Sequence, residues 1–161
     1  MHPIDRSRPL KLIITHSPLF RAHWALFIPH AHSETIGTKI HVTGTLATGF
    51  EHEFQRDFDL ASDAKGCSIR VLGSVDEAHL IAFSIESSKT EDSKSAKNRI
   101  EEIALNVPAP GGSLRSATGT TIKPIEVKDC QYWMREYVAV LVVEKMVAPD
   151  AAEELEKAPV H

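Results

Sequence analysis

Asp129-Cys130-Gln131-Tyr132-Trp133 opens the strongly apolar run near the end of the chain, and the fold and chemistry of the protein are inferred outward from it. Asp129 is a good helix N-cap, which places Cys130 at the first helical position. The free amides of a helix N-terminus favour the thiolate, the reactive form of cysteine. We therefore expect a nucleophile with a depressed pKa at Cys130. The other interpretation is a buried cysteine that acts as a small hydrophobe.

The helix that begins here is predicted to run from Asp129 to about Val147. Its apolar residues recur at helical spacing on one stripe, as expected for a helix packed on a core; they are Cys130, Met134, Tyr137, Val138 and Leu141. We expect one domain over residues 10–148, preceded by an N-terminal tail over residues 1–9. Residues 149–161 form an acidic, Ala-rich tail that is expected to be frayed or loosely docked.

His23-Trp24-Ala25-Leu26-Phe27 is the first strong strand pattern, in a strand predicted over residues 22–28 and ended by Pro29. Strand alternation puts His23 on the same face as Ala25 and Phe27. A histidine paired with a cysteine can act as its general base. Alone, His23 reads more readily as a structural histidine, so its weight comes from the combination with Cys130.

His41 lies in the next predicted strand, over residues 38–43. If this strand pairs with the preceding one as a hairpin, His41 faces the same side as His23. It could then hold the tautomer of His23, as the third member of a triad does. The alternative is a partly exposed strand histidine. His52 competes for the same role, although its place between Phe50 and Phe54 favours a core histidine.

The remaining pattern is that of an α+β protein. Strands are predicted over residues 11–15, 50–58, 68–72 and 79–85, and a helix over residues 95–105. In the strand over 50–58, Phe50, His52, Phe54 and Phe58 are expected to share one face, and the acidic face opposite to be wet. The small-residue loop over 113–121 could cross a cleft.

Composition excludes several classes of protein. The net charge of −4 with scattered Lys and Arg argues against a nucleic-acid partner. Only two cysteines, Cys67 and Cys130, are present, and the N-terminus lacks the apolar core of a signal peptide. The apolar run over residues 138–143 is far too short to span a bilayer. We therefore expect a cytoplasmic protein with no stable membrane anchor.

A metal site is a minor alternative. His30 and His32 form an H-x-H pair that could bind zinc with His41 or Cys130, but the sequence holds no second closely spaced ligand pair. The expectation is no metal and no cofactor. Asp129 and Gln131 flank the nucleophile, and either could orient or cap.

Three short boxes resemble the lecithin retinol acyltransferase-like proteins, which are circularly permuted papain-fold enzymes. His23-Trp24-Ala25-Leu26-Phe27 is similar to their histidine box, Ile40-His41-Val42 to their second histidine, and Asp129-Cys130-Gln131-Tyr132-Trp133 to their Asn-Cys-Glu-His-Phe box. The permuted papain-fold deSUMOylating peptidases share the histidine-then-cysteine order with a similar cysteine box, and the chain resembles small uncharacterised fungal proteins. Asp129 and Tyr132 depart from the asparagine and histidine of the cysteine box, and the hydrophobic tail of the acyltransferases is missing.

The resemblance implies a permuted papain-like domain, in which an antiparallel sheet packs against a C-terminal helix that carries Cys130. It also implies a cysteine hydrolase or acyltransferase with Cys130, His23 and His41 as its triad, acting on a small-molecule or peptide acyl substrate. A non-catalytic binding module on the same fold is the alternative, and zinc binding is a third hypothesis.

Overall fold

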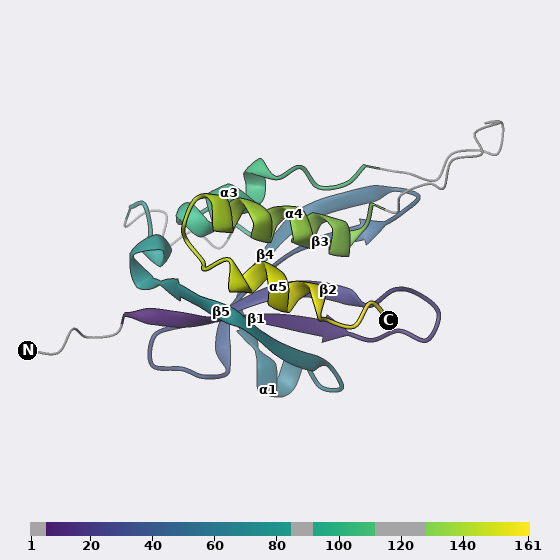
Figure 1. The fold of residues 1–161 in the computed structure, drawn as a ribbon, viewed down its shortest axis with the longest axis horizontal. Coiled ribbons are helices and arrows are strands. Elements are labelled where there is room, and N and C mark those ends of the chain that lie inside the picture. Colours follow the sequence, from purple (N-terminus) through teal and green to yellow (C-terminus); the bar gives the residue numbers. More distant parts are fainter. Residues whose placement is uncertain (1–5, 85–91, 112–127) are drawn as a thin grey trace, which may run out of the picture.

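The computed structural model describes residues 6–84, 92–111 and 128–161. Five antiparallel strands form one sheet in the order β4-β3-β2-β1-β5, as Figure 1 shows. Together with three C-terminal helices this makes an α+β fold, as the sequence predicted. The strands are β1 (Ser7–Thr15), β2 (His23–Pro29), β3 (Ile36–Thr45), β4 (Gly49–Asp59) and β5 (Ser68–Asp76).

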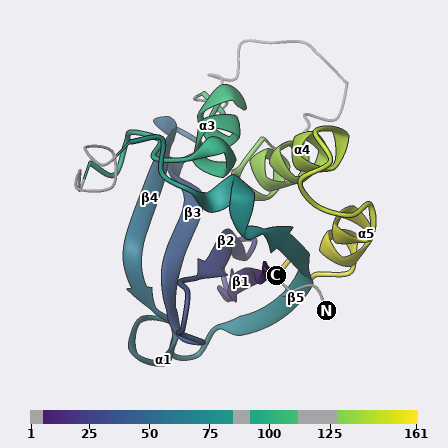
Figure 2. The same ribbon diagram turned by 90° about the vertical axis from the view of Figure 1, so that its left-hand side faces the viewer.

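Among the helices of the described residues, the longer ones cover the same face of the sheet, called here the helix face, and the short α1 lies on the other side (Figure 2). This second side is called the open face. The helices are α1 (Leu60–Asp63), α3 (Arg99–Asn106), α4 (Cys130–Val143) and α5 (Asp150–Glu156), and a 3-10 turn, η1 (Glu77–Leu80), follows β5. Residues that alternate along β2 therefore have different neighbours on the two faces.

Two apolar clusters follow from this alternation. The larger lies between sheet and helices, and Trp24 and Leu26 of β2 belong to it together with most of the α4 stripe. The smaller lies on the open face and contains Ala25 and Phe27 of β2. Both faces of β2 are thus buried, and His23 belongs by alternation to the open face.

The prediction for β4 was wrong at one residue. Phe54 lies in the helix-side core, but Phe58 lies in the open-face cluster. The pairing of β3 with β4 shifts by one position between Gly37 and Lys39, which is the signature of a β-bulge. Because one extra residue reverses the alternation, Phe58 is carried to the opposite face, where the Lys39 ammonium lies 4.7 Å from its ring centre.

Two other expectations fail. Residues 79–84 form no strand; η1 begins after Asp76, whose carboxylate caps it by accepting a hydrogen bond from the Ala78 amide. Helix α3 begins at Arg99, later than expected, because Asn98 is the N-cap. The proposed cleft-crossing loop over residues 113–121 lies outside the described residues, as does Ile85 at the end of the expected strand.

The C-terminal tail forms a docked helix, so of the two expectations for it, a frayed end or a loosely docked segment, the frayed end is wrong. Residues 150–156 form α5, and Ala151 and Leu155 are both 1% exposed. Arg70 of β5 donates hydrogen bonds to the carbonyl and the carboxylate of Glu154. Sparse but regularly spaced apolar side chains are enough to dock a short helix on an existing core. No helix in the described part of the chain is long and apolar enough to cross a membrane.

Candidate functional site

Helix α4 begins at Cys130, as the sequence predicted. Oδ1 of Asp129 accepts hydrogen bonds from the backbone amides of Gln131 (3.0 Å) and Tyr132 (3.1 Å), so Asp129 is the N-cap. Two of the unpaired amides of the first turn are thereby satisfied. The rest of the predicted stripe, Met134, Tyr137, Val138 and Leu141, is buried in the helix-side core.

Gln131 fastens the start of α4 to the residue before His23. Its side-chain amide donates to the carbonyl oxygen of Ala22 at 2.8 Å. Arg21 reaches the same helix start, because its guanidinium donates to Oε1 of Gln131 at 2.6 Å and lies 3.2 Å from the Asp129 carboxylate. Of the two flanking residues that the sequence left open, Asp129 caps and Gln131 tethers.

Cys130 lies at a gap between β2 and β3. The pairing of these strands runs from Pro29 only as far as Leu26, so the edge of β2 at Ala22 and Trp24 is free of β3. The sulfur of Cys130 lies 4.0 Å from the Ala22 carbonyl oxygen and accepts a hydrogen bond from the Trp24 amide. The sulfur thus contacts the backbone of the residues before and after His23. It does so on the edge of β2 where a β3 residue would otherwise pair.

The pKa of Cys130 contradicts the expectation of a depressed value. Burial raises the pKa of the thiol to about 11, and the nearby Asp129 carboxylate adds to this. Hydrogen bonds from the Trp24 and Gln131 amides, and the charge of Arg21, act in the opposite direction but are weaker. A position at the helix start favours the thiolate, yet loss of water costs more when the side chain is only 7% exposed. The resting thiol is therefore protonated at neutral pH.

His23, His41 and Glu53 form a continuous hydrogen-bonded chain on the open face. Nε2 of His23 lies 2.8 Å from Nδ1 of His41, and Nε2 of His41 lies 2.9 Å from Oε1 of Glu53. The two rings meet edge to face with centres 5.0 Å apart. The His23–His41 bond spans, from the open face, the same gap that the Cys130 thiol reaches from the helix face.

The charges of this chain follow from its burial. Burial lowers the pKa of His23 to about 4, and charge repulsion from His41, where it is protonated, and from the Lys39 ammonium acts in the same direction. Burial also lowers the pKa of His41, although its hydrogen bond to Glu53 acts the other way. That hydrogen bond in turn lowers the pKa of Glu53. At neutral pH the chain is two neutral imidazoles and one carboxylate, so His23 is able to accept a proton.

Nδ1 of His23 is the ring nitrogen left for the thiol, because Nε2 is bonded to His41. Among the described residues, the structure contains no hydrogen bond between the His23 ring and Cys130. The Cys130 sulfur contacts the backbone next to His23, but the two side chains approach the gap from different faces of the sheet. A contact of about 3–4 Å between the sulfur and a His23 ring nitrogen, which a catalytic pair requires, therefore stays a prediction.

Glu53 was missed by sequence reasoning, which placed it on a wet acidic face. Its side chain is only 27% exposed, and Gln55 donates a second hydrogen bond to the same oxygen at 2.5 Å. The signal was present in the hairpin: a turn centred on Ala47 pairs His41 with Glu53. Directly opposed residues of an antiparallel pair place their side chains on the same face, within contact distance.

The structure separates His52 from this chain. Its Nε2 bonds the carbonyl oxygen of Val107 at 2.7 Å, and its ring packs edge to face on Trp133 with centres 5.8 Å apart. His52 therefore joins the helix-side core, and His41 is the histidine beside His23. Of the suggested zinc ligands, His30 lies beside Asp57 instead. Within the described ranges, no three His, Cys, Asp or Glu side chains gather as a metal site would require.

A cavity of about 500 Å³ lies at the far end of the sheet, away from Cys130. Its walls combine an apolar floor, with Ile28 and Ile40, and two ion pairs, Arg8–Glu77 and Arg56–Glu101. This volume is within the range of small-molecule sites. None of Cys130, His23 and His41 contributes to its lining, so this cavity and the Cys130 site are separate features.

The chain belongs to a family that is defined by sequence. Residues 10–148 match the model of that family, DUF6540, a family of unknown function. No curated protein and no solved structure matches the chain. The function therefore has to be argued from the geometry of the site.

Proposed function

We propose that the protein is a cysteine-dependent acyl-transfer enzyme on a circularly permuted papain-like fold, with Cys130 as nucleophile, His23 as base and His41 as the residue that orients His23. The single observation that carries this is the His23–His41–Glu53 chain, which ends at the gap where the Cys130 thiol lies. The Glu53 carboxylate orients His41, and His41 in turn orients His23. A histidine held in this way is arranged as a general base requires.

The reaction follows from the protonation states. In the substrate complex Nδ1 of His23 takes the proton of the Cys130 thiol as the sulfur bonds to the acyl carbon, and the leaving group departs with that proton. The next acceptor, water or an amine, gives its proton to His23 as it attacks the thioester, and the thiol is restored. Because burial disfavours both charged forms, the two steps are concerted with proton transfer and do not start from a standing ion pair.

The first turn of α4 supplies the charge stabilisation. Asp129 accepts from the amides of Gln131 and Tyr132, which leaves the amide of Cys130 to face the developing oxyanion. The substrate is an amide, ester or thioester of a small molecule or peptide. Its soluble character is inferred from the acidic closing segment, whose carboxylates would be repelled by anionic headgroups.

The test is acylation by p-nitrophenyl acetate, followed as a burst of p-nitrophenolate and by mass spectrometry of the peptide that contains Cys130. We expect one acetyl group per chain, on Cys130, and no burst from Cys130→Ser. Cys67→Ser is the control and should acylate as the wild type does. Acetylation of both thiols at equal rates, or of neither, sinks the proposal.

A non-catalytic binding module is the second candidate, and the 500 Å³ cavity favours it. In that case the cavity takes a ligand with both polar and apolar groups, and Cys130 is a packed core residue. The two candidates separate in one comparison. Ligand binding that Cys130→Ser leaves unchanged, in a protein that is never acylated, supports the binding module.

A further inference from the structure

The last residues of the chain lie against the candidate site, although they follow the part that the family model matches, residues 10–148. These residues, 158–161, are called here the C-terminal strap. The carbonyl oxygen of Val160 accepts two hydrogen bonds, one from the Ala22 amide at 2.7 Å and one from the Gln131 side chain at 2.8 Å. The Val160 oxygen thus links Ala22, which precedes His23, to Gln131, which follows Cys130.

Two more hydrogen bonds hold the strap in register. The Trp24 indole donates to the carbonyl oxygen of Pro159 at 3.0 Å, and Nδ1 of His16 lies 2.8 Å from the His161 carbonyl oxygen. Ala158 is buried in the helix-side core. Figure 1 shows the C-terminus beside the sheet end where β1 and β2 meet.

The place of the strap explains the gap between β2 and β3. At the free edge of β2, the Ala22 amide donates to the Val160 carbonyl, and the Ala22 carbonyl accepts from the Gln131 side chain. The Trp24 amide donates to the Cys130 sulfur. Because buried backbone groups need partners, this edge is stable without β3 only while the strap and the start of α4 are in place. The strap therefore keeps open the gap that has the thiol on its helix side and the two imidazoles on its open side.

We propose that the C-terminal strap is a positioning element of the candidate active site, which sets the distance between Cys130 and His23 through the Val160 carbonyl. This inference rests on the proposed function. It assigns a role in the site to a segment outside the family-defined domain. A displacement of about 1 Å between reacting groups can cost roughly 100-fold in rate, so a loosened strap lowers acylation while the fold persists.

The test uses the full chain and the variant Gln131→Met, which keeps the length of the side chain and removes its hydrogen bonds to Ala22 and Val160, together with the one it accepts from Arg21. Arg70→Met is the matched control, because it also removes two hydrogen bonds to the C-terminal segment, at Glu154, away from the site. His16→Leu loosens the end of the strap and also removes the hydrogen bond of His16 to Ser68, and it replaces Gln131→Met should that variant fail to fold. Hydrogen exchange of the Ala22 amide reports on the strap, and the p-nitrophenyl acetate burst reports on the site.

In Gln131→Met we expect faster exchange at Ala22 and a burst rate that is lower by roughly 10- to 100-fold, with the half-saturating ester concentration nearly unchanged. Arg70→Met should keep both values. Protection of Ala22 equal to that of the wild type, or faster exchange with an unaltered burst rate, overturns the inference. Absence of a burst in the wild type overturns the proposed function instead, and Ala22 exchange still reports whether the strap is docked.

Discussion

Oε1 of Glu53 lies 2.9 Å from Nε2 of His41, and the two residues face each other directly across the β3–β4 pair. This carboxylate fixes which nitrogen of His41 carries a proton, and through His41 it fixes the tautomer of His23. Nε2 of His41 donates to Glu53, so Nδ1 of His41 accepts from Nε2 of His23. Nδ1 of His23 is then the basic nitrogen, as the proposed reaction needs.

Glu53→Gln tests this relationship. Loss of the carboxylate removes a charge-assisted hydrogen bond, so we expect the acylation rate to fall by about 10- to 100-fold and the pKa of His41 to fall further. The measurement is the burst rate together with NMR titration of the His41 ring. Glu51→Gln is the matched control, since Glu51 is an exposed carboxylate on the same strand that pairs with Lys94. Equal losses in both variants would mean a general charge effect.

His41→Ala should reduce acylation strongly while the protein stays folded, because His41 acts by orienting His23. His52→Ala should instead lower the melting temperature, because His52 bonds Val107 and packs on Trp133 in the helix-side core. Burst rates and thermal unfolding of both variants are the measurements. The assignment of the orienting histidine is wrong if His52→Ala abolishes acylation and His41→Ala does not.

Alkylation of Cys130 by iodoacetamide should be slow at pH 7 and should rise about tenfold per pH unit up to roughly pH 10, because the thiolate is the reacting form. Burial is the cause, since it raises the pKa of this thiol to about 11. Cys67, which is more exposed, serves as the internal comparison and should react first at neutral pH. If the alkylation rate of Cys130 levels off below pH 8, the pKa of the thiol is depressed, as the sequence led us to expect.

Acid should destabilise the protein through His23. The folded pKa of about 4 lies below the ordinary value of 6.5, so between these values the unfolded chain binds more protons. The free energy of unfolding therefore falls as the pH drops from about 6.5 to 4, by about 3 kcal/mol at most. Urea unfolding at several pH values should show a smaller fall in His23→Gln. An identical fall in that variant would assign the acid sensitivity to other groups.

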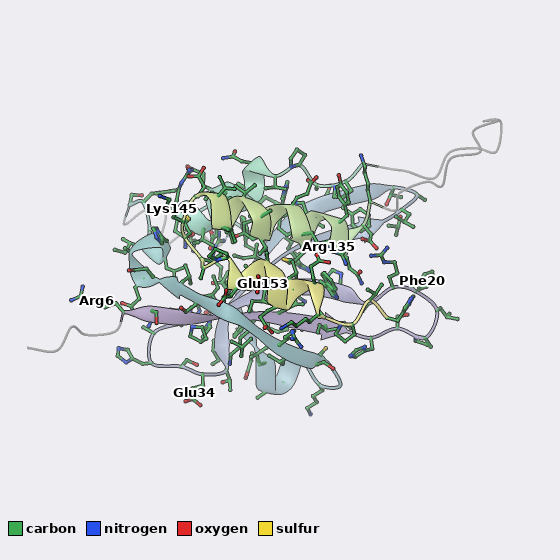
Figure 3. The ribbon with its side chains drawn as sticks, in the orientation of Figure 1. Arg6, Phe20, Glu34, Arg135, Lys145 and Glu153 are labelled. Atoms are coloured by element: carbon green, nitrogen blue, oxygen red, sulfur yellow. The ribbon has the colours of Figure 1, made fainter. Side chains whose placement is uncertain are left out.

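Leu155→Ala should lower the free energy of unfolding by about 2–5 kcal/mol, because this side chain is 1% exposed and its loss leaves a cavity under α5. Glu153→Ala is the control on the same helix; Figure 3 shows Glu153 on α5, and it is exposed. Urea unfolding of both variants checks the prediction. If the two variants have the same free energy of unfolding, the tail is only loosely docked, as its composition suggested.

The sequence alone determined the features that depend on local spacing. Asp129 before an apolar stripe was enough to begin a helix at Cys130, and the strand patterns around His23 and His41 were enough to place both residues on strands. The α+β class followed from the same patterns. These inferences succeed because capping and alternation act over a few residues and need no knowledge of the rest of the chain.

Only the tertiary structure decided the features that depend on burial and register. The bulge that turns Phe58 to the open face, the pairing of Glu53 with His41, and the docking of α5 all arise from contacts between residues far apart in sequence. The pKa of Cys130 is the clearest case. Its place at the helix start, visible in the sequence, favours the thiolate, but the surrounding core removes water from the sulfur. Desolvation is a property of the packed fold, and here it outweighs the local effect.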